Sequence, residues 1–373
     1  MKRFYHVIGC WIGILLCLTG CSIGLETGNG GGDFVNPHRV DTGCVYHLPE
    51  DGVCAECGIA IQDSQGLEFA LSEDGTYYIC VGIGTCTDTQ IVIPAQYEQK
   101  PVAAIGDRAF AECARIKSFV LPNGILSIGE EAFKSCRKCE HFQIPDTVET
   151  VGKGAFKHCK QLTEFRIPSA LQVIPDEMLE GSYRLKTVVM PETVRVIGSH
   201  SFDNCQSLET IELPPQLTEI GSYAFCQCAK LQTLIIPASV QAIGQGAFDE
   251  NTNINEVVYQ GSLTDWLKIE FGSKANPMRI CNKVLIGGEV LSEAVVIPAD
   301  ITELKNYSFD GSMTVKSITL HNGIPAKNIP SQAFFGCSSL TDLYIETTED
   351  KINSFKKTVY FSGNIHYVTE GDS

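Results

Sequence analysis

The chain has 373 residues, of which 44% are apolar and 19% charged, a composition that excludes a disordered protein. Its formal net charge is −16, and no run of basic residues appears, so binding to nucleic acid or anionic lipid by charge is disfavoured. Two interpretations of the net negative charge remain: the protein binds cationic partners, or its acidic side chains only interact with solvent.

Residues 1–21 have the features of a bacterial export signal. Lys2 and Arg3 form a short basic start, and residues 7–18 form an apolar run that is too short for a comfortable membrane span. The run leads into Leu-Thr-Gly-Cys, which ends at Cys21 and resembles the lipobox of bacterial lipoproteins. The resemblance implies acylation of the Cys21 thiol and anchoring outside the cytoplasm, exposed at the cell surface. The alternative is an ordinary signal peptide with an incidental cysteine.

Residues 22–39 are rich in glycine and are expected to form a flexible tether. A small module over residues 40–66 follows, with two pairs of soft metal ligands. The pairs are Cys44 with His47 and Cys54 with Cys57. Each pair has a spacing that suits one ion, so we expect a structural site for zinc or another thiophilic metal, with no open position for catalysis. A disulfide, for instance between Cys44 and Cys57, is the competing interpretation, and a module with neither is the third.

Residues 67–95 alternate apolar and polar, which predicts strands that begin and shield a stack. Over residues 96–258 three columns then recur with a step of 23 residues. The first column holds Phe110, Phe133, Phe156, Leu179, Phe202, Phe225 and Phe248. The second holds Pro122, Pro145, Pro168, Pro191, Pro214 and Pro237, and the third holds Ile105, Ile128, Val151, Ile174, Ile197, Ile220 and Ile243. Such a period predicts a β-dominated solenoid of leucine-rich repeats.

Each repeat has the same internal pattern, which residues 208–228 illustrate. Residues 208–214 alternate apolar and polar, so we expect a short strand with one buried face that Pro214 ends. Gly221 after Ile220 is expected to permit a tight turn. The segment around Phe225 is expected to be a return leg, a turn or a single 3₁₀ turn, whose aromatic ring fills the interior. Stacked repeats, about 4.8 Å apart, then share one core.

The period breaks after Phe248. Residues 259–290, which include Trp266, are expected to form an insertion, a loop or short helix packed on one side of the stack. The repeats resume over residues 291–346, and residues 347–373 are expected to form a closing cap and tail.

A further column consists of cysteines that stand three residues after the aromatic position. Its members are Cys113, Cys136, Cys159, Cys205, Cys228 and Cys337. Neighbouring rungs lie within bridging range of a disulfide. Ser182 and Asn251 replace two members of the column, however, and buried cysteine behaves as a small hydrophobe, so free packed thiols are favoured.

The pattern Pro-x-x-Val-x-x-Ile-Gly-x-x-Ala-Phe-x-x-Cys-x-x-Leu, seen in residues 145–162 and 237–248, resembles the BspA-type leucine-rich repeats of bacterial surface proteins. The resemblance covers roughly residues 76–346 and departs from the pattern at Met178-Leu179, Ser182 and Asn251. It implies binding at the cell surface, often to host or neighbouring-cell proteins, without catalysis.

Two outward columns of the predicted strands are the candidate binding surface. The second of them contains Val120, Gln143, Arg166, Val189, Glu212, Ile235 and Val258, and the first includes Thr210. Apolar side chains on a solvent face suggest a contact site, which we assign to Arg166, Val189, Thr210, Glu212 and Ile235. Against this, β-branched residues simply suit strands.

The predicted function is therefore adhesion to an extracellular or host protein through the sheet face. A structural envelope scaffold without a specific ligand is the alternative. An enzyme is disfavoured because the sequence shows no catalytic set of residues, although a deep polar cleft around Trp266 would reopen that class.

Overall fold

The computed structural model describes residues 49–50, 53–54, 62–281, 283–359 and 361–369. Cys21, Cys44, His47 and Cys57 lie outside these residues. In the cysteine module, β1 (Pro49–Glu50) pairs antiparallel with β2 (Val53–Cys54). The predicted lipid anchor and the predicted metal site, with its disulfide alternative, therefore stay predictions.

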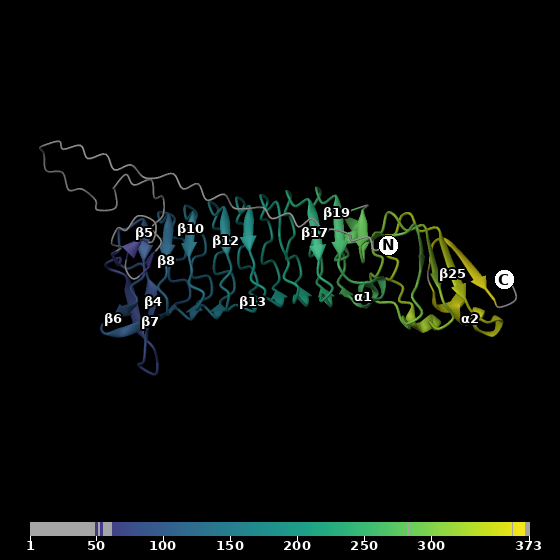
Figure 1. The fold of residues 1–373 in the computed structure, drawn as a ribbon, viewed down its shortest axis with the longest axis horizontal. Helices are drawn as coiled ribbons and strands as arrows, with labels where there is room; N and C mark the ends of the chain where they lie inside the picture. Colours follow the sequence, from purple (N-terminus) through teal and green to yellow (C-terminus); the bar gives the residue numbers. More distant parts are fainter. Residues whose placement is uncertain (1–48, 51–52, 55–61, 282, 360, 370–373) are drawn as a thin grey trace, which may run out of the picture. The chain divides into compact units, whose positions relative to one another are not determined.

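The repeats form a β-solenoid whose rungs, except that of residues 208–214, each contribute a strand to a front ladder, as predicted (Figure 1). Strands of adjacent rungs pair parallel and in register, so that Phe165 faces Val188 and Leu234 faces Val257, whereas β22 pairs antiparallel with β21. The front ladder comprises four sheets. They contain β5 (Gln90–Val92), β8 (Ser118–Val120) and β10 (His141–Gln143); β12 (Glu164–Arg166) and β14 (Thr187–Val189); β17 (Thr233–Ile236), β19 (Glu256–Tyr259), β21 (Val284–Ile286) and β22 (Glu289–Val290); β23 (Ala294–Val296), β24 (Ser317–Leu320), β25 (Asp342–Glu346) and β26 (Asn364–Val368).

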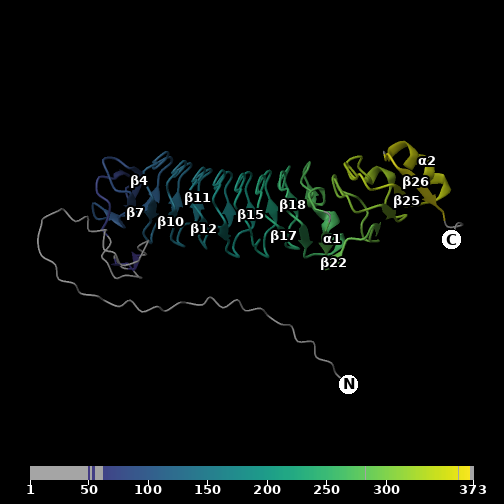
Figure 2. The same cartoon turned by 90° about the horizontal axis from the view of Figure 1, so that it is seen from above.

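A second, back ladder runs beside the front one and was not predicted. From residue 100 on, it is built from the residues before the repeated glycine, which form short parallel strands, and antiparallel pairs add to its N-terminal edge (Figure 2). One sheet contains β3 (Glu68–Leu71), β4 (Tyr78–Gly82), β7 (Lys100–Ile105), β9 (Ser127–Ile128) and β11 (Thr150–Val151), and β6 (Gln96–Tyr97) pairs with β7. The other contains β13 (Val173–Ile174), β15 (Val196–Ile197), β16 (Glu219–Ile220), β18 (Ala242–Ile243) and β20 (Glu270–Phe271).

The repeated glycine after these strands has a different role from the predicted one. A Cβ atom on Gly152 would lie 2.4 Å from the backbone nitrogen of Glu130, and one on Gly221 would lie 2.6 Å from that of Ser199. Glycine is therefore needed because adjacent rungs approach each other closely at this point, and not because the chain turns there.

The return leg consists of turns, as predicted, and it also forms a third hydrogen-bonded ladder. The amide of Phe133 donates to the carbonyl of Ala155 at 2.8 Å, and the amide of Phe156 donates to that of Met178 at 3.0 Å. Two residues of the leg, such as Glu131 and Ser135, have positive φ angles of 52° and 59°. This left-handed backbone aims the amides of the leg at the next rung.

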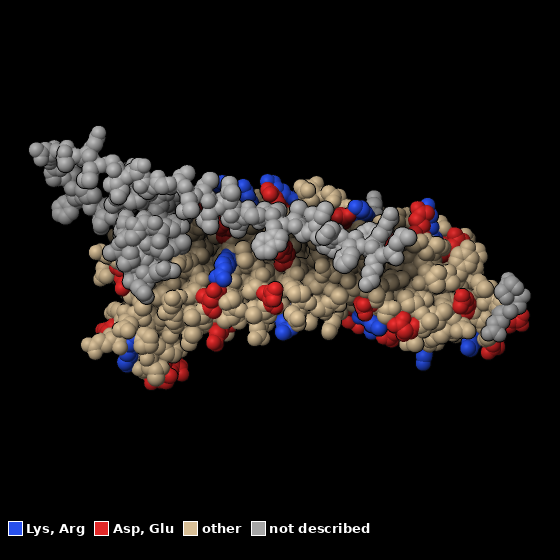
Figure 3. Space-filling view, in the orientation of Figure 1, with Lys and Arg blue, Asp and Glu red and all other residues tan. Residues whose placement is uncertain are grey.

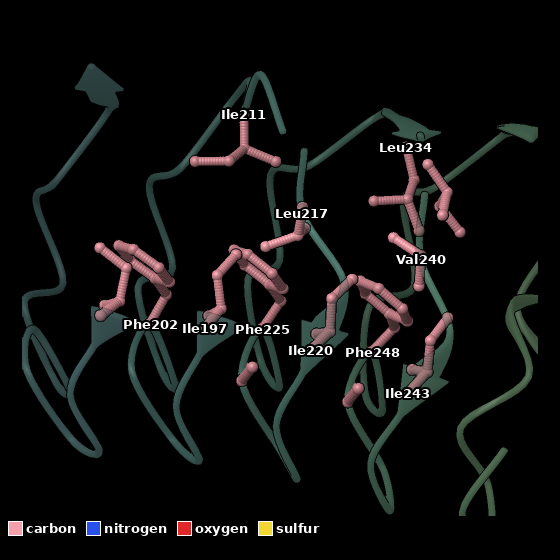
Figure 4. Close-up of a cluster of buried hydrophobic side chains, with 14 of the residues drawn as sticks. Ile197, Phe202, Ile211, Leu217, Ile220, Phe225, Leu234, Val240, Ile243 and Phe248 are labelled. Atoms are coloured by element: carbon pink, nitrogen blue, oxygen red, sulfur yellow. The ribbon is translucent and has the colours of Figure 1, made fainter. Parts of the chain in front are cut away.

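The core is a column of stacked phenylalanine rings, which confirms the predicted interior axis (Figure 4). Phe133 and Phe156 stack with centroids 5.3 Å apart, and Phe202 and Phe225 stack at 5.2 Å. A second set of rings on the front strands packs edge-on against the first near the N-terminal end, where Phe142 lies 4.8 Å from Phe156. Offset and edge-to-face contacts of this kind add to the energy of burial.

The cysteine column is buried over most of its length, and its members are free thiols, as expected. The thiol of Cys159 donates to the carbonyl of Phe133 in the preceding rung at 3.4 Å. Asn251 replaces the thiol with an amide that donates to Phe225 at 2.7 Å. The hydroxyl of Ser182, by contrast, is buried without a hydrogen-bond partner.

Residues 208–214, the segment used above to illustrate the repeat strand, do not form a strand. Ile211 points inward and is buried, whereas Thr210 and Glu212 are exposed, so the alternation of side chains is as predicted. The prediction of a strand is wrong because no regular pairing with β14 or β17 forms in the described chain.

The segment 259–290 contains the expected short helix, α1 (Leu263–Lys268), which a capping box of Ser262 and Asp265 begins. Part of the segment also extends the stack. Ala242 of β18 faces Glu270 of β20, so this rung is longer than the others and α1 takes up the extra residues. The 3₁₀ helix η1 (Pro277–Arg279) follows.

The sheet β23–β26 joins the preceding rungs through side chains. The amide of Asn276 donates to the carbonyls of Tyr307 and Ser308, both at 2.9 Å, and Arg279 pairs with Asp310 at 2.7 Å. The 3₁₀ helix η2 (Ala326–Asn328) and α2 (Glu349–Thr358) complete the C-terminal part. Among the described residues, no helix has the length and apolar character that a bilayer crossing requires.

Candidate binding face

The predicted contact residues all lie on the front of successive rungs. Arg166 of β12 and Val189 of β14 are register partners, and Ile235 stands on β17, two rungs after Val189. Thr210 and Glu212 lie on the rung between, which forms no strand. Val189 is 60% exposed and Ile235 44% exposed, so two large apolar side chains face solvent on this surface.

The solvent exposure of the front-face side chains changes along the stack. Near the N-terminal end, Ser118 and Val120 are buried, so they offer no free surface. Near the other end, Val296 of β23 is 66% exposed. Val296 was not predicted as a contact residue, although its position two residues before Pro298 matches that of Val189 before Pro191. The exposed apolar side chains therefore extend beyond the predicted set.

Acidic and basic side chains are both scattered over the face seen in Figure 3, and two ion pairs lie on this part of the front. Arg166 pairs with Asp146 at 3.0 Å, and Lys283 pairs with Glu256. The pKa of Asp146 lies below its usual range because the backbone amide of Ser169 donates to it and Arg166 lies beside it. Asp146 is thus ionised at neutral pH, and the ion pair leaves this region without strong local charge.

A groove of about 510 Å³ opens beside Arg166, at the ends of β8 and β10. Its lining includes the half-buried ring of Phe142, the prolines Pro122 and Pro145, and the side chain of Gln143. The carbonyl oxygen of the Gln143 side chain is buried there without a hydrogen-bond partner. A second groove, of about 550 Å³, lies on the back ladder between β11 and β13.

The region around Trp266 is closed. Trp266 is fully buried, packs on Tyr259 and Phe271 with ring centroids 5.3 Å away in each case, and donates its indole N–H to the carbonyl of Ser308. Within the described residues, no group of three or more histidine, cysteine or acidic side chains is arranged to hold a metal ion. Trp266 therefore lies in the core and not in a polar cleft.

A family model described as BspA type leucine rich repeat region matches residues 85–195, 173–276 and 289–370, in six copies. The chain belongs to this family. The matched residues include every front strand from β5 to β26 except β21, so Val189, Ile235 and Val296 belong to the BspA-type repeats themselves. No curated protein matches the chain.

Several solved structures are similar to this BspA-type chain. A leucine rich cell surface protein from Faecalibacterium prausnitzii is 21% identical, with 81% of this chain and 98% of that one covered and a TM-score of 0.41. A leucine-rich repeat protein from Bacteroides ovatus is 19% identical, with 83% and 99% covered and a TM-score of 0.35. The pneumococcal vaccine antigen PcpA is 15% identical, with 82% and 98% covered and a TM-score of 0.45.

Proposed function

We propose that this BspA-type protein is a lipid-anchored protein of the bacterial surface that binds an extracellular or host protein through the front of its solenoid. The observation that carries the proposal is the set of large apolar side chains left in solvent on an ordered sheet face: Val189, Ile235 and Val296. Single exposed apolar residues are ordinary, but these three occupy equivalent positions on different rungs of one ordered face, as an extended contact surface requires.

The net charge of the chain indicates which charge the binding partner carries around the contact. The net charge is −16, so a partner with a basic rim around an apolar centre is favoured by electrostatic complementarity. Rim charges of this kind mainly accelerate association and exclude wrong partners, whereas the buried apolar anchors supply most of the affinity.

The test compares two lysine variants of the soluble protein that starts at residue 22. The first carries Val189→Lys and Ile235→Lys on the front. The control carries Gln172→Lys and Gln241→Lys, which add the same charge at exposed positions of the back. Immobilised wild type and control are expected to retain the same host extracellular proteins, and the front variant is expected to lose them. If the front variant retains the same proteins with undiminished affinity, binding through this face is wrong.

The anchor requires its own experiment because Cys21 lies outside the described residues. Cells supplied with an alkyne fatty acid are expected to label the wild-type protein and not the Cys21→Ser variant, which should leave the membrane fraction. If the Cys21→Ser variant is still labelled, the proposed lipid anchor at Cys21 is wrong, whereas the proposal of binding through the front is unaffected.

We retain structural zinc at Cys44, His47, Cys54 and Cys57 as part of the proposal. Elemental analysis of the reduced soluble protein is expected to find about one zinc per chain, and less than a fifth of that in a Cys54→Ser variant. A mass two protons lighter for the unreduced protein, with no metal, would favour the disulfide instead.

A further inference from the structure

Both strand ladders stop at the same boundary between two rungs, which we call the seam. On the front, β10 pairs with β8 and β12 pairs with β14, and on the back β11 pairs with β9 and β13 pairs with β15. Over residues 62–281, no strand pair joins β10 to β12 or β11 to β13. The front ladder is also open at residues 208–214, but the back ladder continues there from β13 to β20, so over residues 62–281 the seam is the boundary at which both ladders are open.

The return-leg ladder crosses the seam without interruption. The amides of Gly154, Phe156 and His158 donate to the carbonyls of Asp176, Met178 and Glu180 at 2.9, 3.0 and 2.7 Å. One of the three ladders thus remains bonded where the other two are open. The rungs on the two sides of the seam are therefore joined by a backbone ladder only along the return-leg edge.

The sequence explains the open back ladder. In the neighbouring rungs the repeated glycine donates its amide to the carbonyl of the preceding rung, as Gly152 does to Ile128 and Gly198 does to Ile174, both at 2.8 Å. Pro175 occupies this position at the seam, and proline has no amide hydrogen to donate to Val151. The aromatic column is interrupted in the same rung, because Leu179 stands where the other rungs have phenylalanine.

A groove borders each open face, although aromatic rings pack across the seam in the core, where the centroids of Phe156 and Phe165 lie 4.8 Å apart. The groove of about 510 Å³ is lined mainly by the rungs before the seam and reaches it at Arg166, and the groove of about 550 Å³ lies over the back, between Val151 and Val173. Val173 is 50% exposed. In the rungs on either side, the side-chain atoms Gln143 Oε1, His158 Nδ1 and Ser182 Oγ are buried without hydrogen-bond partners. Such atoms are costly in a tightly packed interior.

Side-chain ion pairs bridge the seam in place of the missing backbone bonds. Lys157 contacts Glu177 at 2.7 Å and Glu180 at 2.9 Å beside the return leg, and Lys153 contacts Glu177 at 2.8 Å. Arg166 reaches back to Asp146 on the front. Long side chains tolerate small changes of distance that a strand ladder does not, because their rotamers readjust.

We propose that the seam is a hinge. The rungs before residue 160 and the rungs after it move as two blocks about the return-leg ladder of residues 154–158 and 176–180, and the front and back open and close in opposite senses. The motion changes the spacing of β10 and β12, and hence the shape of the front groove at Phe142. The hinge is a property of the stack and holds whether or not the front binds a protein.

The test measures distances with spin labels attached to a genetically encoded keto amino acid, which leaves the native cysteines alone. One pair replaces Leu126 and Thr218 and spans the seam across four rungs. The control pair replaces Val173 and Glu270 and spans four rungs of the neighbouring column on one side of the seam. Both separations are roughly 19 Å from the rung spacing. The first distribution is expected to be at least about twice as broad as the second, as hinge motion requires.

Two substitutions at residue 175 then separate a hinge from a merely irregular rung. Pro175→Gly restores the amide donor and should narrow the spanning distribution to the width of the control. Pro175→Ala restores the same donor but keeps the Cβ that proline already has, at a position where a Cβ on Gly152 or Gly198 would lie only 2.4 or 2.6 Å from the preceding rung, so the distribution should stay broad. Equal widths for the two wild-type pairs, or no narrowing in Pro175→Gly, would overturn the proposal.

Discussion

The guanidinium of Arg279 lies 2.7 Å from the carboxylate of Asp310, and the side chain of Asp310 is completely buried. Burial raises the pKa of Asp310, although the Arg279 charge acts against it. The pair joins the rung of η1 to the rung of Phe309, at the boundary where β23–β26 begin a separate sheet. A buried charge at such a joint is tolerated only while its partner is present.

Replacing one member of this pair should therefore destabilise the protein. Asp310→Ala leaves Arg279 without its partner and removes a buried side chain beside Gly336, so we expect the free energy of unfolding to fall by about 3 kcal/mol. Asp300→Ala removes an exposed carboxylate near Lys268 and should cost less than about 1 kcal/mol. Urea unfolding followed by the fluorescence of Trp266 measures both, and equal losses would contradict the prediction.

The ion pairs around Glu177 make stability depend on pH. Burial acts to raise the pKa of Glu177, but hydrogen bonds from Lys153 and Lys157 outweigh it and lower the pKa to about 2. Because the folded pKa lies below the unfolded value near 4.5, the contribution is present above pH 4.5 and is lost as the pH falls toward 2.

Glu177→Gln should accordingly lower the stability at pH 7 by about 1 kcal/mol after allowance for solvent screening, and have no effect near pH 2. Thermal unfolding at pH 7, 4 and 2 measures the difference from wild type. Glu219→Gln, at an exposed position of β16, serves as the control and should change little at any pH. A Glu177→Gln difference that is constant with pH would be inconsistent with the ion pair as its source.

The cysteine column predicts that one substitution should stabilise the protein. Ser182 is buried and its hydroxyl has no partner, whereas thiols at equivalent positions donate to the carbonyl 26 residues earlier. Ser182→Cys should bring a thiol within reach of Phe156 and raise the free energy of unfolding by about 1 kcal/mol under reducing conditions.

Ser201→Cys is the matched control, because Ser201 is equally buried but its hydroxyl donates to the carbonyls of Pro175 and Gly198. The same chemical change at that position should destabilise the protein. If both serines respond alike to replacement, hydrogen bonding does not decide the composition of the column.

Thiol reactivity should follow burial along the column. Desolvation raises the pKa of Cys80 to about 12 and that of Cys337 to about 11, but Cys337 and Cys113 are only partly buried. Alkylation of the native protein at pH 8, read by peptide mass, should modify Cys113 and Cys337 at least about tenfold faster than Cys159 or Cys228, because the thiolate and its access are both required. Equal alkylation rates for all of these cysteines would show that the buried thiols are as accessible to the reagent as the partly buried ones.

The step of 23 residues was sufficient to predict the stacked rungs, the front strands and the interior phenylalanines, because a repeated side chain must occupy an equivalent place in every rung. The back ladder was missed because strands such as Val196–Ile197 are only two residues long, which is too short for an alternating pattern to be visible. The strand predicted for residues 208–214 failed because alternation fixes which side chains point inward and does not guarantee pairing with the neighbours.

The contact surface was predicted in part. Exposure of Val189 and Ile235 follows from the period of two in a strand, and the same rule applied to Val296 would have extended the set. The burial of Val120 depends on what packs over one end of the sheet, which the strand pattern does not contain. The seam was visible in the sequence only as Pro175 in place of glycine, and its effect on both ladders required the structure.

Alternate amides of the return leg point toward higher residue numbers, from Phe110 to Ala132, from Phe133 to Ala155 and from Phe202 to Ala224. Peptide dipoles that align in this way add along the stack, and back-ladder amides that point the other way, such as that of Gly221 to Ile197, offset part of the sum. The solenoid therefore carries an electrical polarity, positive where the rungs finish and negative where they start. Because the two ends differ in sign, a contact between two copies would be favoured when the last rung of one copy meets the first rung of the other.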